Sequence, residues 1–332
     1  TKARKPSSSS STAAVERLRA LRKRRRQDRT AVNVARLVKH RDAARQAVAQ
    51  GAALVMNCFG SVACMAIAQE LKAPAVPLIG AIAGDDRLRG PDLPHVFTTR
   101  VGARDEVEVV IKYLQGVRLS DLLVIYQDDG FGKSALAAGK PVFERAKLTP
   151  LSELPLAADA STVPDTVAKV RASEPNALLL LASPRATVAL VKALREAGQA
   201  MPIYNLAAQA NRKVVADLGK HTQGMIFSTL VPSPWRRRPG VVQDYQDAVR
   251  AATGKDEFSY LGLEIYINAR MLEDGLRQAA RKPDRDGLLS ALESLGERSF
   301  GDVMRIHWGP GDHSGSRYVG ITIINRDGQF IE

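Results

Sequence analysis

The pattern of the sequence changes after residue 50, where short apolar runs begin to alternate with amphipathic stretches. An apolar run of five residues, as at 177–181, is typical of a strand buried on both faces, and the amphipathic stretch after it supplies the crossover that a parallel strand needs. The alternation therefore predicts an α/β fold with parallel sheets. The expected strands cover 52–59, 75–79, 95–100, 121–126, 177–181, 202–204, 224–230, 303–307 and 317–324, and the expected helices cover 61–71, 104–114, 133–146, 186–197, 241–252, 259–280 and 284–294.

The alternation falls into two sets, which predicts two doubly wound lobes. The second set begins with the strand at 121–126 and is interrupted by three prolines between 232 and 239, which mark a crossing or linker. Three further helices follow this crossing, so we expect the chain to return to the first lobe and the domains to be discontinuous. The expected division is a basic N-terminal segment over 1–45, lobe 1 over 46–117 and 233–295, and lobe 2 over 118–232 and 296–332.

Positive charge is concentrated at one end of the chain. The formal net charge is +13, yet residues 1–45 hold 15 Lys and Arg against 3 Asp and Glu, so the remainder is nearly neutral. Within this region 2–12 has no apolar periodicity, which indicates disorder, and 13–50 has the composition of a basic helix or two. A basic tail on a neutral body favours contact of the tail with anionic surfaces, and argues against a body that follows nucleic-acid phosphates.

Motifs of catalysis and metal binding are missing from the sequence. It has no phosphate-binding loop, dinucleotide glycine pattern, nucleophile elbow or metalloprotease helix, and its five histidines have no nucleophile or carboxylate partner nearby in the chain. The adjacent acids Asp128 and Asp129 favour a turn and helix cap over a metal site. We expect Cys58 and Cys64 to be small buried residues without a disulfide between them. The sequence thus predicts binding without turnover, and no catalytic residue, metal or cofactor.

Ligand contacts are expected where parallel strands end, because loops and helix N-termini converge there. Ser61 follows the strand at 52–59 and opens a helix, so its hydroxyl and the neighbouring backbone N–H groups either receive an anion or serve only to cap that helix. Small residues at 80–84 allow a ligand to approach the backbone, unless this segment is a plain loop. Phe131 is either an aromatic wall of the site or part of the core. The remaining strand-end segments are 126–132, 183–185 and 205–209.

Taken in chain order, these segments resemble the Leu/Ile/Val-type substrate-binding proteins of ABC transporters, which have the type I periplasmic binding fold. The similarity spans about residues 46–332 and depends on many weak motifs that occur in the family's order. It implies a Venus-flytrap of two lobes joined by three crossings, which closes on a small ligand. The segments that carry it are Phe59-Gly60-Ser61, Ala68-Gln69-Glu70, Val76-Pro77, Leu88-Arg89, Val96-Phe97-Thr98-Thr99-Arg100, Tyr126-Gln127-Asp128-Asp129-Gly130-Phe131-Gly132, Arg195-Glu196-Ala197-Gly198, Gly224-Met225, Glu264-Ile265-Tyr266, Leu288 to Leu292 and His313-Ser314-Gly315-Ser316.

The resemblance implies eight ligand contacts, divided between a carboxylate-holding turn with small neighbours in lobe 1 and an aromatic or small wall in lobe 2. They are Gly60, Ser61, Ala81 and Ala83 in lobe 1, and Phe131, Ser183, Pro184 and Ala207 in lobe 2. Ala207 falls about where amino-acid binders of the family place an acidic residue for the ligand's ammonium group. Alanine cannot pair with a buried cation, so a carboxylate without an amine, or an amide, becomes at least as well supported as an amino acid.

The N-terminus departs from the family pattern. The family opens with a strand, a glycine-bearing turn that touches the ligand, a long helix and a Gly-Gly turn, whereas residues 1–50 contain no glycine and are strongly basic. Our hypothesis is a truncated or divergent N-terminus, which leaves edges and apolar surface of lobe 1 uncovered. The sequence shows no apolar secretion-signal region with a cleavage pattern, so the expected periplasmic location rests on the resemblance alone.

The leading interpretation is a non-enzymatic extracytoplasmic receptor that binds a small carboxylate, amide or amino acid between its lobes and delivers it to an ABC transporter permease in the membrane. We expect a monomer that does not bind nucleic acid. The alternative is a ligand-sensing transcriptional regulator whose basic N-terminal segment contacts DNA. A helix-turn-helix unit needs a turn between two apolar-faced helices, and 13–50 lacks both the glycine and a clear second apolar face.

Overall fold

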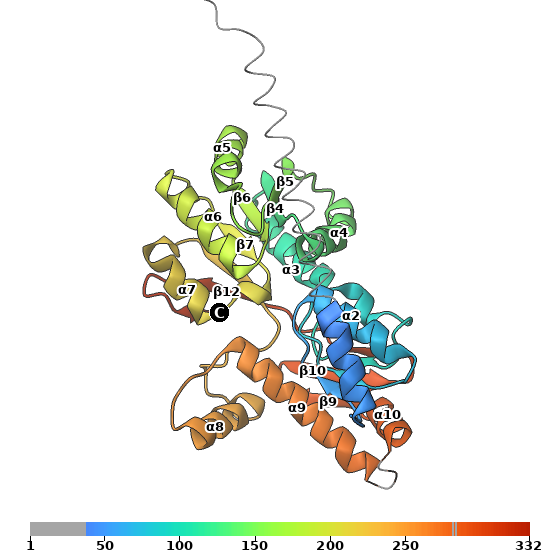
Figure 1. Cartoon of the computed structure of the whole chain (residues 1–332). Coiled ribbons are helices and arrows are strands. Elements are labelled where there is room, and N and C mark those ends of the chain that lie inside the picture. Colours follow the sequence, from blue (N-terminus) through green and yellow to red (C-terminus); the bar gives the residue numbers. More distant parts are fainter. Residues whose placement is uncertain (1–37, 281, 283) are drawn as a thin grey trace, which may run out of the picture.

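The computed structural model describes residues 38–280, 282 and 284–332, and it divides into two α/β lobes (Figure 1). The basic run 22–26 and the serine-rich segment before it lie outside the described residues. Residues 38–49, within the stretch for which a basic helix is expected, are helical. Within the described part of the chain, no helix is long and apolar enough to cross a membrane.

Lobe 2 is built on a seven-stranded sheet, the upper body in Figure 1. Its central strand β6 (Ala177–Leu181) is five apolar residues that are all buried, as expected for a strand covered on both faces. The parallel strands are β4 (Leu122–Gln127), β5 (Ser152–Leu156), β6, β7 (Ile203–Asn205) and β8 (Met225–Thr229), and the antiparallel β12 (Gly320–Ile324) and β13 (Phe330–Ile331) extend the sheet beyond β8. The strand order is β13-β12-β8-β7-β6-β4-β5.

Helices cover both faces of this sheet. They are α3 (Ala103–Gly116), α4 (Gly130–Arg145), α5 (Val163–Ser173), α6 (Pro184–Glu196) and the short α7 (Arg212–Leu218), with 3-10 turns at η2 (Ala207–Gln209) and η3 (Gly219–His221). The apolar side of α3, with Val107, Val110 and Leu114, packs in one core with α4, β4 and β6. The helix α3 therefore packs on lobe 2, although it was expected in lobe 1. The chain crosses from lobe 1 to lobe 2 just before this helix.

Lobe 1 has a smaller sheet of three parallel strands, each two residues long. They are β1 (Val55–Met56), β2 (Leu78–Ile79) and β3 (Val96–Phe97), in the order β1-β2-β3, and α2 (Ser61–Lys72) and η1 (Asp86–Arg89) connect them. The first two strands are shorter than expected, because the backbone leaves the extended conformation at Asn57 (φ 57°), before the expected end of β1, and at Ala75 (φ 49°), at the expected start of β2. The helices α8 (Val241–Thr253), α9 (Tyr260–Ala279) and α10 (Arg285–Glu293) complete this lobe.

A third, antiparallel sheet packs on lobe 1 and was expected in lobe 2. It contains β9 (Gly296–Phe300), β10 (Met304–Gly309) and β11 (Asp312–Ser316), with β10 paired to each of the other two. The Trp308 indole N–H donates to the Thr98 carbonyl over 2.7 Å, and the His313 ring stacks on Phe97 at 4.0 Å. These contacts attach residues 296–316 to β3, so only β12 and β13 of the expected segment 296–332 join the lobe 2 sheet.

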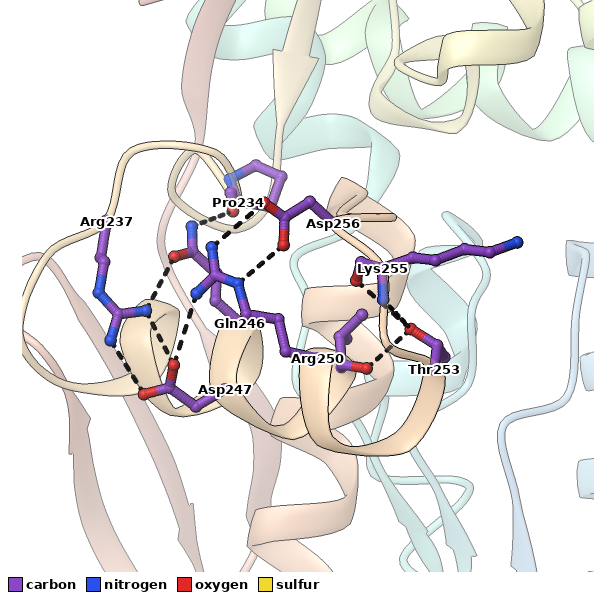
Figure 2. Close-up of polar contacts among 9 residues, drawn as sticks. Pro234, Arg237, Gln246, Asp247, Arg250, Thr253, Lys255 and Asp256 are labelled. Carbon is purple, nitrogen blue, oxygen red and sulfur yellow. Dashed lines mark hydrogen bonds and ion pairs between the residues drawn. The ribbon is translucent and has the colours of Figure 1, made fainter.

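The segment between β8 and α8 is the second crossing between the lobes, and α8 holds it in place. The Gln246 side-chain amide donates to the Pro234 carbonyl over 2.8 Å, and Arg237 forms an ion pair with Asp247 at 2.9 Å (Figure 2). The neighbouring Trp235 ring stacks on Phe330 of β13, with ring centroids 5.3 Å apart and planes inclined by 4°. The crossing is thus bonded to the lobe 1 helix α8 and packs on the lobe 2 strand β13.

Most expected helices agree with the structure, whereas several short elements were missed. The missed strand β5 contains Pro155 and forms one edge of the sheet, where proline is tolerated. Edge strands lack the continuous apolar run that identifies β6, so their pattern resembles that of a loop. The other missed elements are α5, α7, β9, β11 and β13.

Two buried histidines predict that acid weakens the fold. Burial lowers the pKa of His95, whose Nε2 lies 2.9 Å from the Ala68 carbonyl oxygen, and it also lowers the pKa of His313. Below pH 6.5 the unfolded chain binds these protons and the folded chain does not, so these groups lower the free energy of unfolding as the pH falls. The slope reaches about 1.4 kcal/mol per pH unit for each group.

This prediction is measured by urea unfolding at several pH values between 7 and 5. We expect the free energy of unfolding of H95Q to fall less steeply with falling pH than that of the unaltered chain, because one of the two buried imidazole rings is gone. H307Q changes an exposed imidazole and is the matched control. Equal slopes for all three proteins would contradict the prediction.

Candidate ligand-binding site

A cavity of about 670 Å³ lies between the lobes, at the carboxyl ends of the parallel strands of both sheets. Cavities of this size hold small organic molecules, and this position is where open α/β sheets bind ligands. The structure brings together seven of the eight expected contacts at this cavity: Gly60, Ser61, Ala83, Phe131, Ser183, Pro184 and Ala207. Ala81 is 1% exposed and lies in the lobe 1 core instead of the cavity wall.

The lobe 1 wall is the start of α2. Gly60 has φ 86°, a conformation that glycine adopts without strain, and the N-terminus of the helix has no side-chain cap. The first backbone N–H groups of a helix have no intrahelical acceptor and carry partial positive charge. Ser61 lies next to these N–H groups, lines the cavity and is 5% exposed. This end of the cavity can therefore accept an anion or a carbonyl oxygen.

A disulfide joins Cys58 to Cys64, so the expectation of two unpaired cysteines was wrong. The Gly60 turn folds the start of α2 back toward the end of the preceding strand, which places the two Cα atoms 5.4 Å apart, a separation that a disulfide spans. All five residues between the cysteines, 59–63, line the cavity. The disulfide therefore closes the loop that forms the lobe 1 wall.

Removing this disulfide is expected to lower the free energy of unfolding. The double variant C58S/C64S should lose about 2 kcal/mol of unfolding free energy, the value that the chain-entropy model gives for a loop of this length. Urea unfolding with and without a reducing agent measures the effect, and the variant serves as the control because the reductant should not change it. Titration of two free thiols in the denatured, unreduced chain would contradict the prediction.

The lobe 2 wall consists of the starts of α4 and α6. The Asp129 side chain accepts hydrogen bonds from the backbone N–H groups of Phe131 (3.0 Å) and Gly132 (3.1 Å), which confirms its expected role as a helix cap. Pro184 occupies the first turn of α6, where its missing N–H is not needed. Phe131 and Ser183 thus enter the cavity wall from two neighbouring helix starts.

Three charged residues at the cavity were missed from the sequence. The Arg100 Nε lies 3.3 Å from Glu264 Oε1, and both side chains are less than a tenth exposed. On the lobe 2 side, Glu106 Oε2 accepts hydrogen bonds from the Ala207 backbone N–H (2.7 Å) and the Ser228 hydroxyl (2.6 Å). These partners are distant in the chain, so no local spacing identifies the pairs. The position of Arg100 just after a strand is the one sequence signal that could have directed attention to it.

Burial shifts the pKa of two ionisable side chains near this pair, Glu264 and Arg89. Burial raises the pKa of the Glu264 carboxyl, and the Arg100 charge partly offsets that rise. Near this pair, the half-buried Arg89 donates to the backbone carbonyls of Ala83 and Arg100 at 3.0 and 2.9 Å. Burial, with the neighbouring Arg100 charge, lowers the pKa of Arg89 to about 10. Arg100 and Glu264 line the cavity and can form ionic or hydrogen-bonding contacts with a polar ligand.

A larger cavity of about 1030 Å³ lies between α7 and the turn that joins β12 to β13. It shares no lining residue with the inter-lobe cavity, and its cations Arg212, Lys220 and Arg326 are exposed to solvent. It is also away from the carboxyl ends of the parallel strands. Among the described residues no group of three or more His, Cys, Asp or Glu side chains could hold a metal ion. The inter-lobe cavity is therefore the candidate site.

Comparisons with known proteins agree with this geometry. A family model described as periplasmic binding protein matches residues 39–329. A possible leucine/isoleucine/valine-binding protein from Rhodopirellula baltica SH 1 is 18% identical with a TM-score of 0.81, over 89% of this chain and 82% of that one.

Two further solved structures have described ligands or substrate classes. A solute-binding protein of an ABC transporter from R. palustris, in complex with benzoate, is 14% identical with a TM-score of 0.76, over 89% of this chain and 81% of that one. A fatty acid ABC transporter substrate-binding protein from Thermomonospora curvata is 19% identical with a TM-score of 0.72, over 83% and 72% of the two chains. No curated protein matches the sequence. At these identities the likeness shows the fold alone.

Proposed function

Because the chain belongs to the periplasmic binding protein family and has the fold of ABC transporter substrate-binding proteins, we propose that it is an extracytoplasmic solute receptor. It binds a small carboxylate, amide or amino acid between its lobes and delivers it to a membrane permease. One observation carries the proposal: a ligand-sized cavity whose walls come from helix starts of both lobes. Contacts from both lobes to one ligand favour the closed state of a hinged protein.

The disulfide supports an extracytoplasmic location, because disulfides persist in oxidising compartments such as the periplasm. The proposed receptor acts as a monomer and has no catalytic role. Its cavity offers charged and apolar contacts to a ligand. The inter-lobe site therefore suits binding and release of an unchanged solute.

Glu106 supports the amino acid as one of the candidate ligands. Ala207 has no carboxylate, yet its backbone N–H holds the Glu106 carboxylate 2.7 Å away, at the same wall. Both hydrogen bonds to this carboxylate, from the Ala207 backbone N–H and the Ser228 hydroxyl, end on Oε2, and no described residue donates to Oε1. The cavity thus offers an acid in lobe 2 opposite the N–H groups of the α2 start in lobe 1, an arrangement that fits a zwitterion or an amide as well as a carboxylate.

Thermal unfolding of the purified chain with a ligand panel tests the proposed function. The panel pairs leucine with 4-methylpentanoate and phenylalanine with 3-phenylpropanoate, and adds benzoate and benzamide. A ligand at about 100 times its Kd should add about 2.7 kcal/mol of stability. A cooperative transition that none of these or related small solutes shifts would contradict the proposal.

The variant E106Q then separates the ligand classes. If the ligand carries an ammonium group, E106Q should weaken binding by about tenfold or more, because a charge-assisted hydrogen bond is lost. Binding of the matched acid without the amine should not weaken. Isothermal titration of both members of a pair measures the difference, and an equal effect on both would contradict a role for Glu106 in recognising the amine.

A further inference from the structure

Gln127 is a buried amide directly behind the lobe 2 wall of the cavity. It is the last residue of β4, is 4% exposed and does not line the cavity. Its Oε1 accepts a hydrogen bond from the Ser183 backbone N–H over 3.0 Å, and its Nε2 donates to Asp129 Oδ2. One side chain therefore contacts both segments that form this wall.

Each of these contacts continues to a cavity-lining residue. Asp129 uses its other oxygen, Oδ1, to accept from the Phe131 and Gly132 N–H groups at the start of α4. Ser183 is itself a lining residue and is followed by Pro184 in the first turn of α6. A chain of hydrogen bonds thus runs from one helix start through Gln127 to the other.

The surrounding packing leaves these helix starts little freedom. A Cβ atom at Gly132 would lie 2.2 Å from the Gln127 carbonyl oxygen, so α4 begins in close contact with the end of β4. The Gln127 carbonyl oxygen also accepts from the Asp129 N–H over 2.8 Å. The position of the α4 start is therefore fixed by both the backbone and the side chain of Gln127.

We propose that Gln127 is a positioning residue that sets the distance between the α4 and α6 starts, and thereby the ligand affinity of the site. The statement about affinity rests on the proposed function. The position needs an acceptor toward Ser183 and a donor toward Asp129, and a neutral amide supplies both. Glutamate at this position would place a carboxylate against the Asp129 carboxylate, and leucine would supply neither group.

Hydrogen–deuterium exchange of the full chain tests the positioning without any ligand. In Q127L and Q127E we expect the amides of Phe131, Gly132 and Ser183 to exchange about tenfold faster, because their acceptors are lost or displaced. Q246L is the matched control, since Gln246 is another buried glutamine that donates one hydrogen bond, at the second crossing (Figure 2). Unchanged exchange at these three amides in a folded variant would overturn the proposal.

Q127E keeps the size of the side chain and remains measurable if Q127L does not fold. Its defect should also shrink as the pH is lowered, because a proton shared between the two facing carboxyl groups restores a donor toward Asp129. A defect that comes only from lost stability would instead persist or grow in acid. The exchange rate of Q127E is therefore compared with that of the unaltered chain at each pH, and a ratio of the two rates that does not fall at low pH would overturn the role assigned to the donor.

The effect on ligand affinity is measured with whichever panel compound stabilises the unaltered chain. Its Kd should rise about tenfold in Q127L and Q127E and stay unchanged in N176L, whose side chain bonds Asp121 at the amino ends of β4 and β6, when measured under conditions in which all proteins are folded. An unchanged Kd in the Gln127 variants would overturn the proposal. If no compound binds the unaltered chain, the proposed function fails, and the exchange measurement alone decides whether Gln127 holds the wall.

Discussion

Replacing Arg100 by methionine is expected to lower the free energy of unfolding by about 3–5 kcal/mol, the range for breaking a buried ion pair by removing one partner. The Arg100 and Glu264 side chains are 7% and 9% exposed, so the substitution leaves a carboxylate with little access to water. In this variant the Glu264 carboxylate can lose its charge only by binding a proton. The variant R100M should therefore lose much more stability than a variant that breaks an exposed ion pair.

The pH dependence of R100M gives a second test of the same pair. Burial raises the pKa of Glu264, and Arg100 opposes that rise, so the pKa should increase further in R100M. A group with a raised folded-state pKa is stabilising while protonated, and this contribution is lost as the pH rises through the folded pKa. The deficit of R100M should hence be smaller at pH 5 than at pH 7 in urea unfolding without ligand.

Two further variants bracket the result. R100M/E264L removes both charges and should recover most of the lost stability, because no unpaired charge stays buried. K213M breaks the Lys213–Asp217 pair, whose side chains are 82% and 43% exposed, and should cost less than about 1 kcal/mol. A cost of R100M no larger than that of K213M would contradict the prediction.

The substitution N268L is expected to cost about 3 kcal/mol or more. Asn268 of α9 is fully buried, donates from Nδ2 to Asn57 Oδ1 over 2.7 Å, and accepts from the Thr99 hydroxyl. Leucine has a similar size and leaves both partners without a hydrogen bond, and each unsatisfied buried group costs about 1–3 kcal/mol. Urea unfolding measures the change in free energy.

Asn268 also joins segments that are far apart in the chain. It links α9 to residues just after the ends of β1 and β3, and its amide lies 3.4 Å from the Gly80 carbonyl oxygen after β2. The matched control is N176L, because Asn176 is only partly buried and its bonds to Asp121 lie near the surface. If N268L were no less stable than N176L, this junction would not hold the lobe 1 sheet together.

The lobe architecture could be predicted because it depends on local patterns. The run at β6 is buried along its whole length, and α2 and α9 begin within one residue of the expected positions. Seven of the eight expected ligand contacts share one cavity, because the ends of parallel strands meet at one edge of each sheet. Whether these residues bind ligand stays a prediction.

What the sequence did not reveal depends on contacts between distant residues. Glu106 meets Ser228 across 122 positions, and Asn268 meets Asn57 across 211, so no periodicity connects them. The Cys58–Cys64 disulfide depends on how Gly60 turns the chain, which composition does not specify. The position of α3 on lobe 2 likewise depends on where the chain crosses, since both lobes bury helices with the same apolar pattern.

The two tryptophans of the chain have different surroundings, which makes intrinsic fluorescence a measure of lobe movement. Trp308 is fully buried beside Phe97, and the Thr98 carbonyl accepts its indole N–H, so its emission should change little when the lobes move. Trp235 lies on the second crossing and stacks on Phe330 of the opposite lobe, so a hinge motion must alter its surroundings. In the background W308F, the fluorescence of Trp235 therefore follows opening and closing directly, without a chemical label.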